Sequence, residues 1–257
     1  MIATIEATAA QSLAKSKLAQ LVDGTWLMPG QAPSGPILEG TTAVVDTDAI
    51  KIFAPDQRAT KAIGVLRDSG IRGDGPVCVY DRAGFFSAPW VAWLLVSHGH
   101  SASLVIGDGP PGQLTLQTGD VTSQADPIEM NARKADIFAA IGTDTQIVDA
   151  RPAARFAGTA PEPRKGCRAG HMPGALNLPF SEIKHGARYR DFEDIAAIVR
   201  AKGIDLDKPV ITTCGSGVTA SAIAVPLQRL GAQDVRVYQG SWLEYGMDPD
   251  VPVETGA

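Results

Sequence analysis

The sequence has no apolar run that could cross a membrane, and we expect no secretory leader from the pattern of its first residues. Its longest clean apolar stretch, residues 91–96, is far shorter than the roughly 20 residues that span a bilayer. Residues 1–20 show no basic segment followed by an apolar block, which is the pattern of a signal peptide. We therefore expect a cytoplasmic protein that does not bind a membrane.

Cysteine is also scarce. The chain has 3 cysteines, Cys78, Cys167 and Cys214, and they lie far apart in the sequence. An odd number of cysteines at such distances forms neither a disulfide framework nor a Cys-x-x-C metal site. We expect a reducing compartment, so any functional cysteine would act as a free thiol.

An excess of positive charge is missing too. The 257 residues include 23 Lys and Arg against 28 Asp and Glu, for a net charge of −5. This balance argues against non-specific binding of nucleic acid, which requires a basic surface. Hydrophobic residues make up 44% and charged residues 20%, which excludes a disordered chain and allows one large or two small globular domains.

What the sequence does contain is an internal repeat. A short apolar run that ends in aspartate occurs at 21–23 and again at 147–149, and a second apolar run occurs at 76–81 and at 209–214. Helical patterns follow the second pair of runs, at residues 88–97 and 219–230. Matching features lie about half of the chain apart, which indicates two copies of one α/β unit, each a mainly parallel sheet flanked by helices.

The repeat predicts two tandem domains. The polar segment at 112–131 lacks helical periodicity and separates the two copies. We expect a first domain at residues 1–115, a linker at 116–131 and a second domain at 132–257.

The loop between the last apolar run and its helix carries the most chemical information. It reads Cys214, Gly215, Ser216, Gly217, Val218 and Thr219. The thiol is thereby placed at the carboxyl end of a parallel strand, where open α/β sheets carry their sites. The following helix N-terminus and the N–H groups that the glycines expose favour an anion. We interpret Cys214 as a nucleophilic thiolate and the loop as its anion cradle.

Other interpretations of this loop exist. A cysteine at a strand end is often a small buried hydrophobe, and the glycines could serve only a turn. A cysteine phosphatase is excluded, because Ala220 stands where the Cys-x5-Arg motif has its arginine. A Walker A loop is excluded as well, because the stretch contains no Gly-Lys-Ser/Thr.

The loop and three further blocks resemble the tandem-domain sulfurtransferases of the rhodanese superfamily, and among them the 3-mercaptopyruvate sulfurtransferases. Gly215 and Ser216 are neutral, whereas thiosulfate-specific members typically carry charged residues directly after the cysteine. The other matching blocks lie at residues 149–164, 170–177 and 238–245. The resemblance is strong over 132–248 and weaker over 20–112.

The resemblance implies an enzyme that moves sulfur from 3-mercaptopyruvate through a Cys214 persulfide to an acceptor, with release of pyruvate. The acceptor would be a thiol, such as that of thioredoxin, or cyanide. No metal and no organic cofactor is implied, and we expect a monomer. A thiosulfate donor is the alternative within the family, and a non-catalytic sulfur carrier or regulatory module is a further alternative.

The resemblance also places two substrate-binding arginines at Arg155 and Arg164. A planar guanidinium can hold the carboxylate and the adjacent carbonyl of mercaptopyruvate in a two-point contact. The alternative is that both arginines form surface ion pairs of little energetic value. Ser216 matches a loop hydroxyl that would relay a proton to the pyruvate enolate, and its alternative role is turn formation.

The first copy departs from the family pattern. Asp81 stands in the place of Cys214, so we expect no sulfur transfer in the first domain. The first histidine of the chain is His98, which leaves the first domain without the family's His-x-Pro-Gly-Ala type of segment.

Two features of the second copy predict structure rather than chemistry. The segment around His171 is typical of a turn that enters a strand, with the histidine hydrogen-bonded locally. Ser241 and Glu244 have the spacing of a capping box, which predicts the start of a helix.

Overall fold

The computed structural model describes residues 2–28, 30–73, 75–106 and 130–256. Contacts divide the chain into two units. The first comprises Met1–Phe53, Arg58–Pro127 and Gly186–Arg188, and the second comprises Ala54–Gln57, Ile128–His185 and Tyr189–Ala257. The predicted linker at 116–131 lies outside the described residues except at its end, and the predicted domain boundaries stay predictions.

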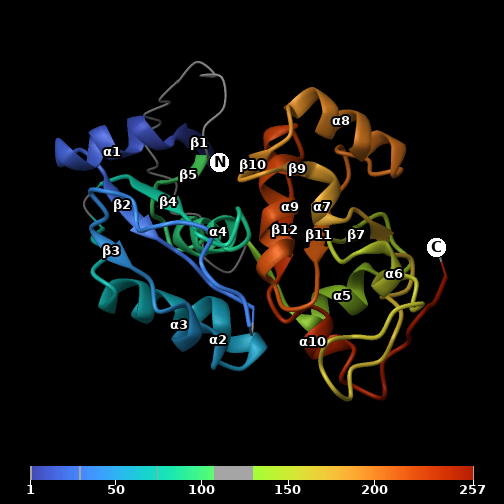
Figure 1. Cartoon of the computed structure of the whole chain (residues 1–257). Helices are drawn as coiled ribbons and strands as arrows, with labels where there is room; N and C mark the ends of the chain where they lie inside the picture. Colours follow the sequence, from blue (N-terminus) through green and yellow to red (C-terminus); the bar gives the residue numbers. More distant parts are fainter. Residues whose placement is uncertain (1, 29, 74, 107–129, 257) are drawn as a thin grey trace. The chain divides into compact units, whose positions relative to one another are not determined.

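The first unit is built around a sheet of five strands in the order β1-β5-β4-β2-β3, and every neighbouring pair in it is parallel. The elements of this half of the chain are β1 (Ala3–Glu6), α1 (Ala7–Lys15), β2 (Gln20–Asp23), β3 (Ala43–Val44), α2 (Thr47–Lys51), α3 (Pro55–Asp68), β4 (Val77–Tyr80), α4 (Ala88–Val96) and β5 (Ala102–Ile106). Figure 1 shows them in the blue-to-green part of the chain.

The second unit repeats this plan with a five-stranded parallel sheet in the order β6-β12-β11-β7-β8. Its elements are β6 (Asn131–Ala132), α5 (Lys134–Ala140), β7 (Gln146–Asp149), α6 (Ala153–Phe156), β8 (Leu176–Asn177), α7 (Phe180–Ile183), β9 (Lys184–His185), β10 (Arg188–Tyr189), α8 (Phe192–Ala201), β11 (Val210–Thr213), α9 (Val218–Arg229), β12 (Val235–Tyr238) and α10 (Ser241–Tyr245). The two sheets have the same strand order once each strand is matched to its counterpart. This confirms the predicted α/β fold of two mainly parallel sheets.

Helices cover both faces of the first sheet, as its buried apolar strands require. Helix α1 packs on the face that presents Leu21, Cys78 and Tyr80. Helix α4 contacts β4 and β5 from the opposite face, where Val79 and Val91 both lie beside Gly24. The alternation of neighbouring residues in β4 between the two faces follows from the two-residue repeat of a strand.

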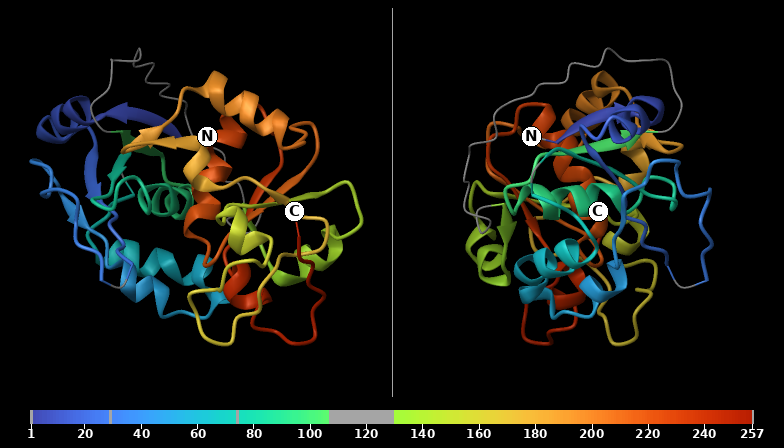
Figure 2. Two further views of the ribbon diagram at one scale, coloured as in Figure 1. Left: turned by 45° about the vertical axis from the view of Figure 1, so that its right-hand side comes forward. Right: turned by 90° about the vertical axis from the view of Figure 1, so that its left-hand side faces the viewer.

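The second sheet is covered in the same way. Helices α5 and α10 pack with Ile147 and Ile211 on one face, and α9 runs along β11 and β12 (Figures 1 and 2). No helix of the described residues is long and apolar enough to cross a membrane. The arrangement places the loop between β11 and α9 at the carboxyl edge of the sheet, where parallel α/β sheets carry their sites.

Candidate active site

Cys214 lies where β11 ends and the loop to α9 begins. The residue is buried, with 2% of its surface exposed. Its sulfur accepts the N–H group of Ser216 at 3.4 Å and that of Gly217 at 3.2 Å. Because these N–H groups lie at the start of α9, their dipoles and the helix dipole direct positive charge at the sulfur. Backbone N–H groups placed in this way direct hydrogen-bond donors at the sulfur atom.

Gly217 lets the loop turn back around the sulfur. It has a φ of +90° and forms the N-cap of α9, and an added Cβ would lie 2.7 Å from the carbonyl oxygen of Gln239. Both conditions require glycine. Val218 and Thr219, which were also expected in the cradle, form the first turn of α9, whose N–H groups lack intrahelical partners.

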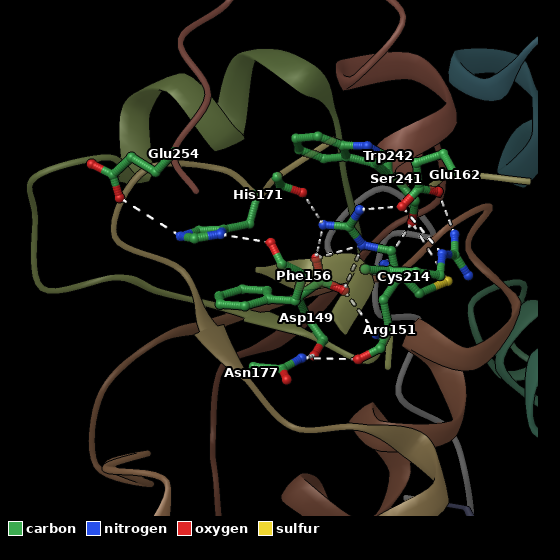
Figure 3. A network of polar contacts seen from close by, with 12 residues as sticks. Asp149, Arg151, Phe156, Glu162, His171, Asn177, Cys214, Ser241, Trp242 and Glu254 are labelled. Atoms are coloured by element: carbon green, nitrogen blue, oxygen red, sulfur yellow. Dashed lines mark hydrogen bonds and ion pairs between the residues drawn. The ribbon is translucent and has the colours of Figure 1, made fainter. Parts of the chain in front are cut away.

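The start of α10 holds the cysteine loop from another side. The hydroxyl of Ser241 accepts the N–H group of Cys214 at 3.1 Å and donates to the carbonyl oxygen of Tyr238 at 2.8 Å. Its oxygen also lies 3.9 Å from the sulfur of Cys214 (Figure 3). The N–H group of Trp242 donates to the carbonyl oxygen of Cys214 at 2.9 Å. The backbone of the cysteine is therefore fixed on both its N–H and its carbonyl side.

The predicted capping box of Ser241 and Glu244 is wrong. Helix α10 does begin here, but its N-cap is Gly240 and no side chain caps it. Ser241 has a φ of 51°, whereas a capping residue has extended backbone angles. Its hydroxyl is consequently directed at the cysteine loop and not at the N–H groups of its own helix.

A buried ion pair lies next to this loop, at the end of β7. The side chains of Asp149 and Arg151 are each 1% exposed, and Nε and Nη2 of the arginine donate to the carboxylate at 2.9 and 2.7 Å. The guanidinium also stacks 4.3 Å from the ring centroid of Trp242 (Figure 3). Burial lowers the pKa of Arg151, but the carboxylates of Asp149 and Glu162 outweigh burial and raise it.

Glu162 connects this buried pair to the cysteine loop. Its carboxylate is 4% exposed and accepts Nη1 of Arg151 at 2.9 Å and Nε of Arg155 at 3.1 Å. It also pairs with Nη2 of Arg155. That Nη2 lies beside the loop, because a Cβ added to Gly215 would stand 3.2 Å from it. The structure thus brings the predicted Arg155 to the loop that carries Cys214.

The second predicted arginine, Arg164, is exposed. Its guanidinium has no hydrogen bond or ion pair with any residue that the structure describes. Burial raises the pKa of the Cys167 thiol and the charge of Glu162 adds to this, while the charges of Arg151, Arg155 and Arg164 lower it. The guanidinium of Arg164 is thus open to solvent, and its charge acts on the Cys167 thiol together with the charges of Arg151 and Arg155.

Comparison with known proteins identifies the family. A sequence model described as a rhodanese-like domain matches residues 135–248. The 3-mercaptopyruvate sulfurtransferase of Escherichia coli strain K12 is 36% identical over 201 residues, which cover 74% of this chain and 71% of that protein. The chain belongs to the rhodanese-like sulfurtransferases. A protein of Arabidopsis thaliana, named thiosulfate/3-mercaptopyruvate sulfurtransferase 1, mitochondrial, is 31% identical to this sulfurtransferase over 280 residues. The alignment covers 92% of this chain and 74% of that protein.

A solved structure supports the same assignment. It is a crystal structure from Escherichia coli, described as a 3-mercaptopyruvate sulfotransferase with the rhodanese fold. It aligns with this sulfurtransferase at a TM-score of 0.71 and 25% identity, and covers 94% of this chain and 99% of that chain. The two parallel sheets of this chain thus match the rhodanese fold of that structure.

His171 of the sulfurtransferase serves packing. Its Nδ1 is hydrogen-bonded to the carbonyl oxygen of Phe156 at 2.9 Å, and the two rings stack with centroids 3.8 Å apart. Its Nε2 lies 3.8 Å from the carboxylate of Glu254 (Figure 3). These contacts agree with the structural role expected from the sequence, but the hydrogen bond is not local, because Phe156 lies 15 residues before His171.

Two residues of the site had no chemical role in the sequence interpretation. Glu162 was part of a matching block, but no local pattern indicates that its carboxylate joins two arginines. For Ser241 the local pattern predicted a different role, because its spacing to Glu244 matches that of a capping box. Among the described residues, no group of three or more His, Cys, Asp or Glu side chains is placed to hold a metal ion.

Proposed function

We propose that this sulfurtransferase moves sulfur from 3-mercaptopyruvate to a thiol acceptor or to cyanide through a persulfide on Cys214. The observation that carries the proposal is the sulfur of Cys214 held by the N–H groups of Ser216 and Gly217 at the start of α9. Donors fixed in this way stabilise negative charge on the thiolate and then on the outer sulfur of the persulfide, without reorganising during the reaction.

In the first half-reaction the thiolate of Cys214 attacks the sulfur of 3-mercaptopyruvate. An S–S bond forms and the C–S bond breaks, and its electron pair stays on carbon as the enolate of pyruvate. The enolate takes up a proton equivalent to the one that leaves the donor thiol, and Ser216, in the cradle, is the residue proposed to relay it. In the second half-reaction an acceptor thiolate or cyanide takes the outer sulfur, the S–S bond breaks and the thiolate of Cys214 returns.

Donor binding is assigned to Arg155 and Arg164. Arg155 lies beside Gly215, and Arg164 presents an exposed guanidinium nine residues further along the chain. A carboxylate next to a carbonyl matches the planar fork of arginine. The neutral Gly215 and Ser216 favour mercaptopyruvate over thiosulfate, because a dianion gains more from charged residues beside the nucleophile.

The persulfide is tested by mass spectrometry of the protein after incubation with 3-mercaptopyruvate. We expect the mass of one added sulfur atom on the peptide that contains Cys214, and neither this adduct nor turnover in Cys214→Ser. Cys167→Ser is the matched control and should retain both. Turnover that persists in Cys214→Ser would overturn the persulfide mechanism.

The donor is tested by comparing kcat/KM for 3-mercaptopyruvate and for thiosulfate with cyanide as acceptor. We expect mercaptopyruvate to be the better donor, and equal or better use of thiosulfate would reject this assignment. Arg155→Lys should raise KM for mercaptopyruvate by about tenfold, because lysine loses the two-point contact. Unchanged kinetics in this variant would remove Arg155 from the donor site.

A further inference from the structure

The carboxylate of Glu162 lies between Arg151 and Arg155, and the two arginines differ in whether they have another acidic partner. Arg151 is already held by Asp149 through Nε and Nη2, and its Nη2 also donates to the carbonyl oxygen of Gly170 at 2.8 Å. Its charge is therefore balanced without Glu162. Arg155, by contrast, has Glu162 as its ion-pair partner. The charge of Glu162 is thus balanced chiefly against the arginine beside the cysteine loop.

The contact with Glu162 fixes which edge of Arg155 faces outward. Glu162 takes up Nε and Nη2 of Arg155. Within the described residues Nη1 of Arg155 has no hydrogen-bond partner, and the side chain is 24% exposed. A guanidinium held at one edge keeps the donors of the other edge in a fixed orientation, ready for an incoming oxygen atom.

The same contact removes most of the net charge from the arginine. The two acidic and two basic side chains of the network formed by Asp149, Arg151, Glu162 and Arg155 cancel in formal charge. Glu162 is almost fully buried, so water screens its charge only weakly. At Arg155 a donor therefore receives directed hydrogen bonds but little net positive charge, and the net positive charge of the proposed donor site is that of Arg164. One negative charge is accommodated more readily than two.

We propose that Glu162 is a specificity-determining residue that favours sulfur donors with one negative charge over dianionic donors. The inference rests on the proposed function, in which Arg155 binds the donor. Specificity is the difference between two transition-state free energies, so a buried negative charge that penalises the dianion more than the monoanion changes their ratio. Glu162 acts through Arg155 and through its own charge, and does not touch the reacting sulfur.

The test compares two donors of different charge in the full-length protein, 3-mercaptopyruvate and thiosulfate, with cyanide as acceptor. In Glu162→Gln the ratio of kcat/KM for thiosulfate to kcat/KM for mercaptopyruvate should rise about tenfold, because the buried negative charge is removed while a hydrogen-bonding side chain stays. A variant that only loosens the structure would lower both values together. An unchanged ratio in Glu162→Gln would overturn the proposal.

Two further variants complete the design. Glu182→Gln removes a carboxylate that pairs with Lys202 at the surface, and the ratio should not move. Glu162→Asp keeps the charge but is too short to reach both arginines, so KM should rise for both donors at a constant ratio. If the ratio of kcat/KM for thiosulfate to kcat/KM for mercaptopyruvate shifts in Glu162→Asp, the charge of Glu162 does not set the ratio. This outcome contradicts the proposal even if Glu162→Gln fails to fold. Failure of the proposed function is recognised separately, as turnover that persists in Cys214→Ser.

Discussion

Asp81 in the first unit occupies the position of Cys214 in the second, because each directly follows the middle strand of its sheet, β4 or β11. The carboxylate of Asp81 accepts N–H groups from the loop and from the start of α4. Its Oδ1 accepts the N–H groups of Ala83 at 2.8 Å and Phe85 at 3.0 Å. Its Oδ2 accepts those of Ser87 at 2.9 Å and Ala88 at 2.7 Å. The first unit thus retains inward-facing N–H groups, but a carboxylate of the chain itself fills the place where the second unit holds a sulfur.

Replacement of Asp81 by alanine should destabilise the first unit. The N–H groups that now donate to the carboxylate would lose their acceptor, and the start of α4 would lose its bound negative charge. We expect the free energy of unfolding to fall by about 2 kcal/mol or more. Urea denaturation measures this loss. Asp68→Ala is the control, because that carboxylate is exposed and should change stability by less than about 0.5 kcal/mol. Equal stability of the two variants would contradict the structural role of Asp81.

The sequence predicts those elements of the fold that have a local pattern of apolar residues, and does not predict those that depend on contacts with distant residues. The strands that precede Asp81 and Cys214 are contiguous apolar runs, so their position and their helices follow from local pattern. Strands β6 and β8 have two residues each and carry no such pattern; neighbouring strands define them. Two-residue edge strands of this kind become visible only after the sheet has assembled.

Ser241 shows how a local pattern fails when tertiary contacts decide. Its spacing to Glu244 fits a capping box, but the residue takes a left-handed backbone and turns its hydroxyl to Tyr238 and Cys214. Those two partners come from the end of β12 and from the loop after β11. No local sequence pattern predicts these contacts of Ser241, and none predicts the contact between Glu162 and Arg151.

Replacement of Ser241 should slow persulfide formation. Without the hydroxyl, the buried N–H group of Cys214 loses its acceptor and the cysteine is held less firmly in the cradle. We expect single-turnover persulfide formation to slow by about tenfold in both Ser241→Ala and Ser241→Gly. Stability should distinguish the two variants, because glycine accepts the φ of 51° and should recover about 1 kcal/mol relative to alanine.

Ser12→Ala is the matched control for this experiment. The hydroxyl of Ser12 donates to the carbonyl oxygen of Thr8 on the exposed side of α1, in the first unit. Its loss should leave the rate of persulfide formation unchanged. If Ser241→Ala and Ser241→Gly form the persulfide as fast as Ser12→Ala does, Ser241 contributes to stability alone and does not position Cys214.

Stability at high pH should report on Cys78, which lies in β4 with 3% of its surface exposed. Burial raises the pKa of this thiol from 9.0 to about 11. The unfolded chain therefore loses the proton at lower pH than the folded one. The stabilisation is complete below pH 9 and is lost as the pH rises through about 11, at a total cost of about 3 kcal/mol.

Urea denaturation between pH 8 and pH 11 measures this loss for the wild type and for Cys78→Ala. The variant should be less stable at every pH, because a cavity replaces the thiol, but its free energy of unfolding should fall less steeply across the window. Tyrosines and lysines titrate in both proteins, so their contributions cancel in the difference. Parallel pH profiles would show that the folded and unfolded thiols titrate together, which contradicts the burial of Cys78 between β4 and α1.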